Sequence, residues 1–220
     1  MGKLITVVGA SGAGKTSLVN GLNKTGNFTV AFEQHTERPF QALFKRDPQY
    51  GLANQLDYLL YRTEQEKEIR SSRIIGLVDG GLDLDFHGFT RLFHARGLLA
   101  DSEFDLCRRF YELTRQLLPP PDLIIHLVAS DAIIRQRLAR RGRINIASAE
   151  DTALFNSFLD EWLKTIPPSK MLQLDVSKEL PSYDQSIRKI LARVETSTVF
   201  NVIGDGIHSV GKCRNIECRN

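Results

Sequence analysis

The sequence predicts a doubly wound α/β fold in which helices cover both faces of a five-stranded parallel sheet. Five short apolar runs are nearly continuous rather than alternating, as expected for strands that are buried on both faces. Longer stretches with helical periodicity separate these runs along the chain. Alternation of strand and helix is typical of this fold class.

The expected elements follow one another in a regular order. The first apolar run ends at a glycine-rich turn, and prolines at 119–121 and 167–168 end two helices just before the fourth and fifth runs. We therefore expect strands at residues 4–8, 29–32, 74–78, 123–128 and 171–176, and helices at residues 15–22, 50–71, 101–118, 131–140, 149–165 and 183–194.

The composition indicates a single globular domain. Of the 220 residues, 42% are hydrophobic and 25% are charged, which is sufficient for a buried core. We expect this domain to span residues 1–195. The pattern fades in residues 196–220, where we expect a disordered or surface tail and assign no role. The net charge of +3 is too small to indicate a nucleic-acid partner.

Cysteine usage and hydropathy favour a cytoplasmic protein. The three cysteines form no dense disulfide framework, and Cys213 and Cys218 lack a second pair of metal ligands, so we expect no zinc site. No apolar run approaches the roughly 20 residues of a membrane span. The N-terminal apolar run is also too short for a secretory signal, so no membrane partner is expected.

A phosphate-binding loop directly follows the first expected strand. The run GASGAGKT satisfies the pattern G-x-x-x-x-G-K-[ST] and leads into a helix, which is the context that this motif requires. Backbone N–H groups and the helix N-terminus would surround the phosphates of ATP or another nucleoside triphosphate, while Lys15 bridges the β- and γ-phosphates and Thr16 binds Mg²⁺. The expected nucleotide-binding residues are Gly9, Ala10, Ser11, Gly12, Ala13, Gly14, Lys15, Thr16 and Ser17.

Two carboxylates and a group of arginines are expected to face this loop. Glu33 and Asp79 follow the second and third strands, and ligands of an open parallel sheet bind outside the carboxyl ends of its strands. A carboxylate there can hold Mg²⁺ or accept the proton of an attacking hydroxyl. Arg137, Arg141 and Arg143 lie at the end of one helix and in the loop after it, and we expect them in a lid over the triphosphate.

Several spaced motifs beyond the phosphate loop resemble the deoxynucleoside kinase family over roughly residues 3–164. The run EQHTERPFQALFKRDP aligns without a gap on the family's Glu-Pro-Val-x-x-Asn-Pro-Tyr-Leu-x-x-Phe-Tyr-x-Asp-Pro stretch. The run FHARGLLADSEFDLCRRFYELTRQLLPPPDLIIHL resembles the family's helix-to-strand passage, and RQRLARRGR resembles its lid. The resemblance implies a P-loop kinase fold with an arginine-rich lid.

The resemblance also implies roles for single residues. Gln55 and Arg62 match the residues with which the family reads a nucleobase, and their spacing of seven places them on one helix face. Asp79 matches the general base for the nucleoside 5′-hydroxyl, and Asp85 matches the carboxylate that reads the base. Glu33 matches the acid that contacts the same hydroxyl and Mg²⁺.

Four positions depart from the family pattern, and they lie on the acceptor side of the site. Gly80 replaces an arginine near the transferred phosphate, and Gln34 replaces a proline. Lys45 replaces the tyrosine that contacts the sugar 3′-hydroxyl, so we expect this lysine at the acceptor site, and Ile146 replaces the partner glutamate. The nucleotide half of the site is therefore expected to be intact and the sugar half altered. Asp83 has no role in the family, and we expect it to be solvated.

The resulting hypothesis is an ATP- and Mg²⁺-dependent phosphotransferase that phosphorylates the 5′-hydroxyl of a (deoxy)nucleoside or nucleoside-like molecule. The catalytic residues would be Asp79, Glu33 and Lys15 together with the three lid arginines. Two alternatives remain: a catalytically weak, nucleotide-binding regulatory subunit, and a P-loop kinase for another small molecule. The resemblance further implies a homodimer formed through the helices near residues 50–70 and 101–118.

Overall fold

The computed structural model describes residues 1–32, 37–140, 149–197 and 200 of the chain. Its centre is a five-stranded sheet in the order β2-β3-β1-β4-β5, and all four neighbouring pairs are parallel. The predicted fold class and all five predicted strands are thus confirmed. The strands are β1 (Leu4–Gly9), β2 (Phe28–Ala31), β3 (Ile75–Asp79), β4 (Leu123–Val128) and β5 (Met171–Asp175).

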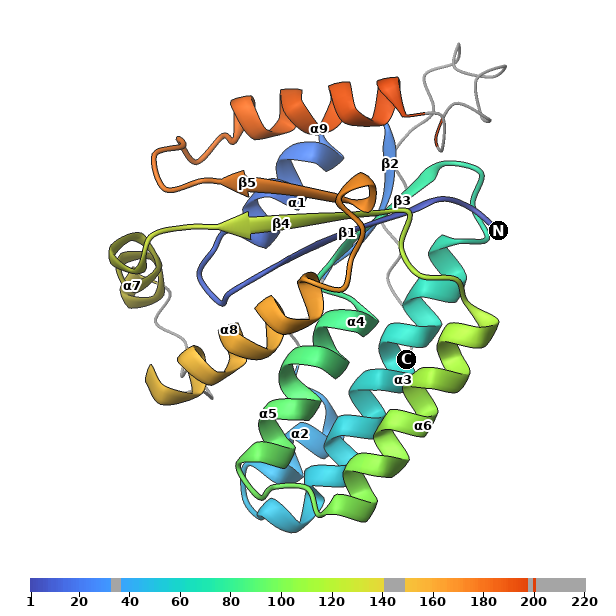
Figure 1. The fold of residues 1–220 in the computed structure, drawn as a ribbon, viewed down its shortest axis with the longest axis vertical. Coiled ribbons are helices and arrows are strands. Elements are labelled where there is room, and N and C mark those ends of the chain that lie inside the picture. The colour runs from blue at the N-terminus through green and yellow to red at the C-terminus, as the bar shows by residue number, and fades with distance from the viewer. Residues whose placement is uncertain (33–36, 141–148, 198–199, 201–220) are drawn as a thin grey trace.

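Helices cover both faces of this sheet (Figure 1). Helices α1 (Lys15–Asn23) and α9 (Asp184–Thr196) lie on one face. The other face carries α3 (Gly51–Ile69), α6 (Asp101–Leu117) and α8 (Ala149–Leu163), and α7 (Asp131–Arg140) follows the end of β4. The six predicted helices are confirmed, with ends that differ by at most two residues from the prediction.

The fold also contains helical elements that the sequence did not predict. One continuous helical segment consists of α4 (Leu82–Leu84), the π-helical turn η2 (Asp85–Thr90) and α5 (Arg91–Ala95). It begins directly after Gly80 and Gly81, whose φ angles are 82° and 97°. Shorter elements are α2 (Pro39–Phe44), η1 (Pro48–Tyr50) and η3 (Pro168–Lys170).

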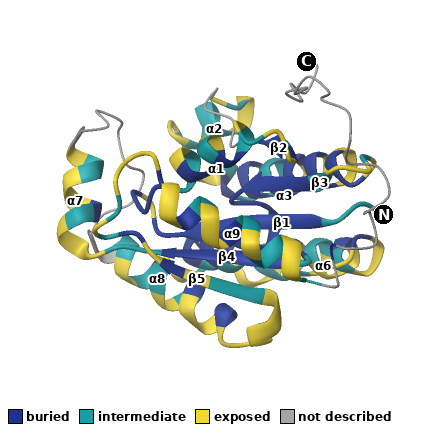
Figure 2. Ribbon diagram, turned by 90° about the horizontal axis from the view of Figure 1, so that it is seen from above, coloured by how far each residue is buried: buried dark blue, intermediate teal, exposed yellow. Residues whose placement is uncertain are grey.

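Packing on both faces makes the sheet the core of the molecule, and its strands are largely buried (Figure 2). On one face, Leu18 and Leu22 of α1 and Ile190 of α9 are fully buried against the strands. On the other, Phe155 and Trp162 of α8 pack near Ile124 of β4. Each such side chain contributes about 1.5–3 kcal/mol relative to exposure.

The register of the strands brings the ends that lead into the site close together. Val7 pairs with Asp79 and Gly9 pairs with Leu127, so β1, β3 and β4 end at one edge of the sheet. Both the phosphate loop and the helical segment 82–95 begin at this edge.

The packed domain extends slightly beyond the expected boundary at residue 195. Helix α9 ends at Thr196, and Phe200 is buried in the same core cluster as α1 and α9. Residues 201–220 of the expected tail lie outside the described residues. Within the described part of the chain, no helix has the length and apolarity needed to cross a membrane.

Candidate active site

The phosphate loop joins β1 to α1 in the conformation that its glycines allow. Gly12 and Gly14 have φ angles of 83° and 104°, which L side chains rarely adopt. Gly14 is also the residue that precedes the first turn of α1, so the helix N-terminus faces the loop. The Lys15 ammonium lies inside the loop and donates hydrogen bonds to the carbonyl oxygens of Gly9 (3.0 Å) and Ala10 (3.2 Å).

Thr16 and Asp79 connect the loop to the end of β3. The Thr16 hydroxyl donates a hydrogen bond of 2.6 Å to Oδ2 of Asp79, which is fully buried. A hydroxyl and a carboxylate oxygen are both hard ligands, and Mg²⁺ commonly uses one or two protein oxygens together with phosphate oxygens and waters. The donor set at this point therefore fits Mg²⁺.

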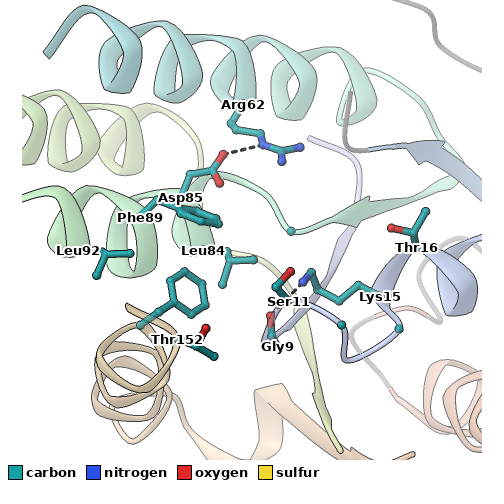
Figure 3. A pocket seen from close by; sticks show the side chains of 14 residues that line it. Gly9, Ser11, Lys15, Thr16, Arg62, Leu84, Asp85, Phe89, Leu92 and Thr152 are labelled. Atoms are coloured by element: carbon teal, nitrogen blue, oxygen red, sulfur yellow. Dashed lines mark hydrogen bonds and ion pairs between the residues drawn. The ribbon is translucent and has the colours of Figure 1, made fainter. Parts of the chain in front are cut away.

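One cavity connects this loop to the side chains expected to read a base (Figure 3). Its wall includes Lys15 and Thr16 at one end and Arg62 and Asp85 at the other. The cavity volume is about 100 Å³. This volume is below the roughly 300–1,000 Å³ that is usual for sites of small ligands.

Arg62 and Asp85 form a buried ion pair at the far end of this cavity. Their side chains are 2% and 7% exposed, and Arg62 Nε lies 2.7 Å from Asp85 Oδ2 (Figure 3). The guanidinium also donates to Gln65 Oε1 at 3.1 Å and to the Asp79 carbonyl oxygen at 3.4 Å. These contacts fix a planar group with several donors beside an acceptor carboxylate, a combination that can hydrogen-bond the edge of a nucleobase.

Gln55 lies on the same face of α3 as Arg62, as its spacing predicts. Gln55 is buried, and its amide oxygen accepts a hydrogen bond of 3.0 Å from the Thr90 hydroxyl. Because this bond occupies the oxygen, it fixes the orientation of the amide group. Gln55 and Arg62 thus both contact the π-helical turn η2, at Thr90 and Asp85 respectively.

Asp83 is buried, so the expectation that it is solvated is wrong. Its carboxylate accepts hydrogen bonds from Arg115 Nε at 2.9 Å and from the Tyr111 hydroxyl at 2.7 Å. Arg115 in turn binds both oxygens of Glu66 at 2.9 Å. These partners could not be predicted from a local sequence pattern, because Tyr111 and Arg115 follow Asp83 by about thirty residues.

Two ring side chains beside this cluster, His87 and Tyr111, are uncharged at neutral pH. His87 stacks on Trp162 and lies 3.1 Å from the Tyr111 hydroxyl. Burial and then the charge of Arg91 lower the pKa of His87 to about 4. Burial and then the charge of Asp83 raise the pKa of the Tyr111 phenol well above its usual value. Both side chains are therefore neutral hydrogen-bonding partners.

Comparison with known proteins identifies the family. A family model for deoxynucleoside kinase matches residues 5–199, which is most of the chain. The chain belongs to the deoxynucleoside kinase family.

The individual relatives of this chain are distant. Deoxyadenosine kinase of Dictyostelium discoideum is 30% identical over 143 residues, which cover 64% of this chain and 58% of that protein. Deoxyguanosine kinase of Bacillus subtilis (strain 168) is 23% identical over 142 residues, covering 63% of this chain and 67% of that protein. The structure of deoxyadenosine kinase from M. mycoides with bound dCTP has the same fold, with a TM-score of 0.73, 18% identity, and coverage of 88% of this chain and 100% of that chain.

Several residues expected in the deoxynucleoside kinase site are placed elsewhere or not described. The Arg137 guanidinium binds backbone carbonyls of Ala13 (2.7 Å) and Val176 (3.2 Å). Lys45 is 53% exposed, forms an ion pair with Glu37, and is absent from the described wall of the cavity. The positions that lie outside the described residues are Glu33, Gln34, Arg141, Arg143 and Ile146.

The structure adds cavity-lining residues, all but one of them apolar, that sequence reasoning missed. The middle of the cavity is lined by side chains of the helical segment 82–95 and of α8: Leu84, Phe89, Leu92, Thr152 and Phe155. Asp85, Phe89 and Leu92 have the i, i+4, i+7 spacing of one helix face, which was a usable signal. The preceding Gly80 and Gly81 concealed it, since paired glycines normally indicate a turn.

Proposed function

We propose that this chain transfers the γ-phosphoryl group of ATP to the 5′-hydroxyl of a (deoxy)nucleoside. The observation that carries this proposal is the single cavity lined by the phosphate loop at one end and by the buried Arg62–Asp85 pair at the other. A nucleoside whose base contacts this pair would direct its sugar toward the phosphate loop. Family membership supports the same reaction.

On the donor side, the phosphate loop would bind the triphosphate. Backbone N–H groups at the start of α1 and the Lys15 ammonium would neutralise the charge that spreads over the transferred group. Arg137 would join this cation cluster only after leaving its carbonyl partners, Ala13 and Val176. Arg141 and Arg143 are proposed to complete the lid.

Thr16 and Asp79 would hold Mg²⁺ between the donor phosphates and the end of β3. When bound, Mg²⁺ supplies positive charge beside the β- and γ-phosphate oxygens. The 2.6 Å bond between the two side chains favours a metal-holding role for Asp79. Glu33, expected to contact both the metal and the hydroxyl, is then the better candidate for the general base, although the family alignment assigned this role to Asp79.

On the acceptor side, Arg62, Asp85 and Gln55 would select the base. The sugar would lie in the middle of the cavity, against the side chains of Leu84, Phe89 and Phe155. Lys45 forms an ion pair at the surface with Glu37 and would need to swing inward to contact the sugar. An acceptor without a strongly bound 3′-hydroxyl is therefore the expectation.

A magnesium titration tests whether Asp79 holds Mg²⁺ and Glu33 acts as the general base. Asp79→Asn should raise the Mg²⁺ concentration needed for half-maximal rate by about tenfold or more and lower kcat by orders of magnitude, while ATP binding without metal stays near normal. Glu33→Gln should lower kcat by about 10²-fold or more, abolish the acidic limb of the pH–rate profile and leave the Mg²⁺ requirement unchanged. Reversed behaviour of the two variants would contradict the assignment.

We also propose that the chain forms a homodimer through α3 and α6. These helices lie side by side (Figure 1), and both carry exposed leucines: Leu60 (48%) on α3, and Leu106 (42%), Leu113 (56%) and Leu117 (66%) on α6. Exposed apolar side chains on two adjacent helices are typical of an interface.

A reducing compartment such as the cytoplasm is proposed as the location of the protein. The buried Cys107 is a free thiol, which agrees with such a compartment.

A further inference from the structure

Side chains from outside the phosphate loop contact three consecutive residues of the loop. A Cβ added to Gly12 would lie 3.0 Å from Leu138 Cγ of α7. The carbonyl oxygen of Ala13 accepts a hydrogen bond of 2.7 Å from Arg137, also of α7. A Cβ added to Gly14 would lie 1.9 Å from the hydroxyl oxygen of Tyr183. The loop is therefore held in shape by its surroundings as well as by its own glycines.

Tyr183 reaches Gly14 from an unfavourable backbone conformation. It precedes α9 with a φ angle of 56°, the one positive value among the described residues other than glycine. Its side chain is nevertheless buried, with 3% exposure, in the core cluster that contains Ala13 and Val176. A bulky residue in the left-handed region costs about 1–3 kcal/mol and persists where the surrounding structure demands it, most often at functional sites.

Arg137 of α7 also contacts the phosphate loop, close to Tyr183. Its guanidinium bridges the Ala13 carbonyl of the loop and the Val176 carbonyl after β5, and it lies 6.0 Å from the centre of the Tyr183 ring. Two parts of the chain that are far from the loop in sequence therefore meet beside it: α7, and the stretch from Val176 after β5 to Tyr183 before α9.

We propose that Tyr183 is a positioning residue that holds the phosphate loop in the conformation that binds the donor. The inference rests on the proposed donor role of the loop. Tyr183 touches Gly14, and Gly14 directly precedes Lys15, so the ring fixes where the loop N–H groups and the ammonium lie. A loop without this support would have to be ordered at the moment of binding, and that conformational entropy would weaken nucleotide affinity.

Tyr183→Asn separates this role from helix stability. Asparagine tolerates the left-handed region and is favoured before a helix, so α9 keeps its start while the ring is removed. The dissociation constant for ADP with Mg²⁺, measured by calorimetry without acceptor, should rise about tenfold. At saturating ATP, kcat should stay within about twofold of the unaltered protein, and the KM for the acceptor should not change.

Ile190→Ala is the matched control, because Ile190 is fully buried in the same cluster and lies on α9, the helix that Tyr183 precedes. It should lower the melting temperature and leave ADP affinity within about twofold, since its effect is the loss of core packing. Tyr183→Phe keeps the ring and should retain most of the affinity.

Two results would overturn the proposal: unchanged ADP affinity in Tyr183→Asn, or equal weakening in Ile190→Ala. Failure of the unaltered protein to bind ADP would instead contradict the proposed function, and the Tyr183 role with it.

Discussion

At the scale of single residues, the proposed acceptor site depends on the buried ion pair of Arg62 and Asp85. Neither side chain is more than 7% exposed, and Arg62 is held by three acceptors, on Asp85, Gln65 and the backbone of Asp79. Moving charges out of water is expensive, and a buried pair is tolerated only when its geometry is good. We therefore expect the pair to contribute little to net stability and to serve the specificity of the proposed acceptor site.

Substitutions of this pair should separate stability from acceptor binding. Asp85→Asn leaves Arg62 buried without its carboxylate and should lower the free energy of unfolding by about 3–5 kcal/mol. The double variant Arg62→Met with Asp85→Leu should recover most of this loss, because apolar groups of similar volume replace the whole pair. Urea unfolding measures both variants.

Although the double variant should be stable, it should bind the acceptor only weakly. Its KM for the nucleoside should rise by about two orders of magnitude or more, because an apolar cavity cannot hydrogen-bond a base. ATP affinity should be unchanged, since the pair lies at the other end of the cavity. A double variant that phosphorylates the nucleoside with a normal KM would show that the pair is only structural.

At the scale of elements, the helical segment 82–95 lines the end of the cavity that is proposed to bind the acceptor. Its π-helical turn widens the helix between Asp85 and Thr90, and such turns are frequent at functional sites. Gly88 in this turn allows α8 to approach closely, since an added Cβ would lie 2.3 Å from Cε2 of Phe155. The turn and α8 together therefore place Phe155 in the wall of the cavity.

Gly88→Ala should disturb this wall. The new methyl group would force Phe155 away from its present position, with a cost of about 1–3 kcal/mol in stability. The KM for the acceptor should change several-fold while the KM for ATP stays constant, as initial rates with each substrate varied would show.

Gly21→Ala is the matched control for this prediction. Its added Cβ would lie 2.7 Å from Cδ1 of Ile187 in the contact between α1 and α9, on the opposite face of the sheet. It introduces a methyl group at a second helix contact, where the flexible end of the Ile187 side chain can move aside, and it should leave the acceptor KM unchanged. If both variants alter the acceptor KM equally, the effect comes from general destabilisation and not from the wall.

At the scale of the whole molecule, the fold could be predicted well because its signals are local. Buried parallel strands are continuous apolar runs, and prolines mark the ends of two of the helices between them. The phosphate loop was also predictable, because one contiguous motif defines it. The long-range contacts could not be predicted, because no local pattern relates the residues that they join. These contacts are Arg115 with Asp83, Phe155 with Gly88 and Tyr183 with Gly14.

The helical segment 82–95 escaped prediction for a different reason. Gly80 and Gly81 follow β3 with positive φ angles, and paired glycines are a normal sign of a turn rather than of a helix start. The buried site of Asp83 was lost with this segment, since the first turn of the helix directs that carboxylate toward Arg115.

The proposed dimer makes a prediction at this scale. Leu113→Glu with Leu117→Glu would place charges on the exposed surface of α6 and should convert a dimer into a monomer, as light scattering after gel filtration would show. Leu180→Glu is the control, because Leu180 is 73% exposed on the loop before α9, away from α3 and α6. A mass that is unchanged in the double variant would exclude this surface as the interface.

The most direct test of the central claim is phosphoryl transfer from labelled ATP with Mg²⁺ to a panel of deoxy- and ribonucleosides, with buffer alone and Lys15→Ala as controls. Lys15→Ala removes the ammonium held within the phosphate loop and should abolish transfer. We predict transfer to one class of nucleoside at the 5′-hydroxyl, and none in either control. Bound ATP without transfer to any nucleoside would contradict the proposal and favour a regulatory subunit or another small-molecule acceptor.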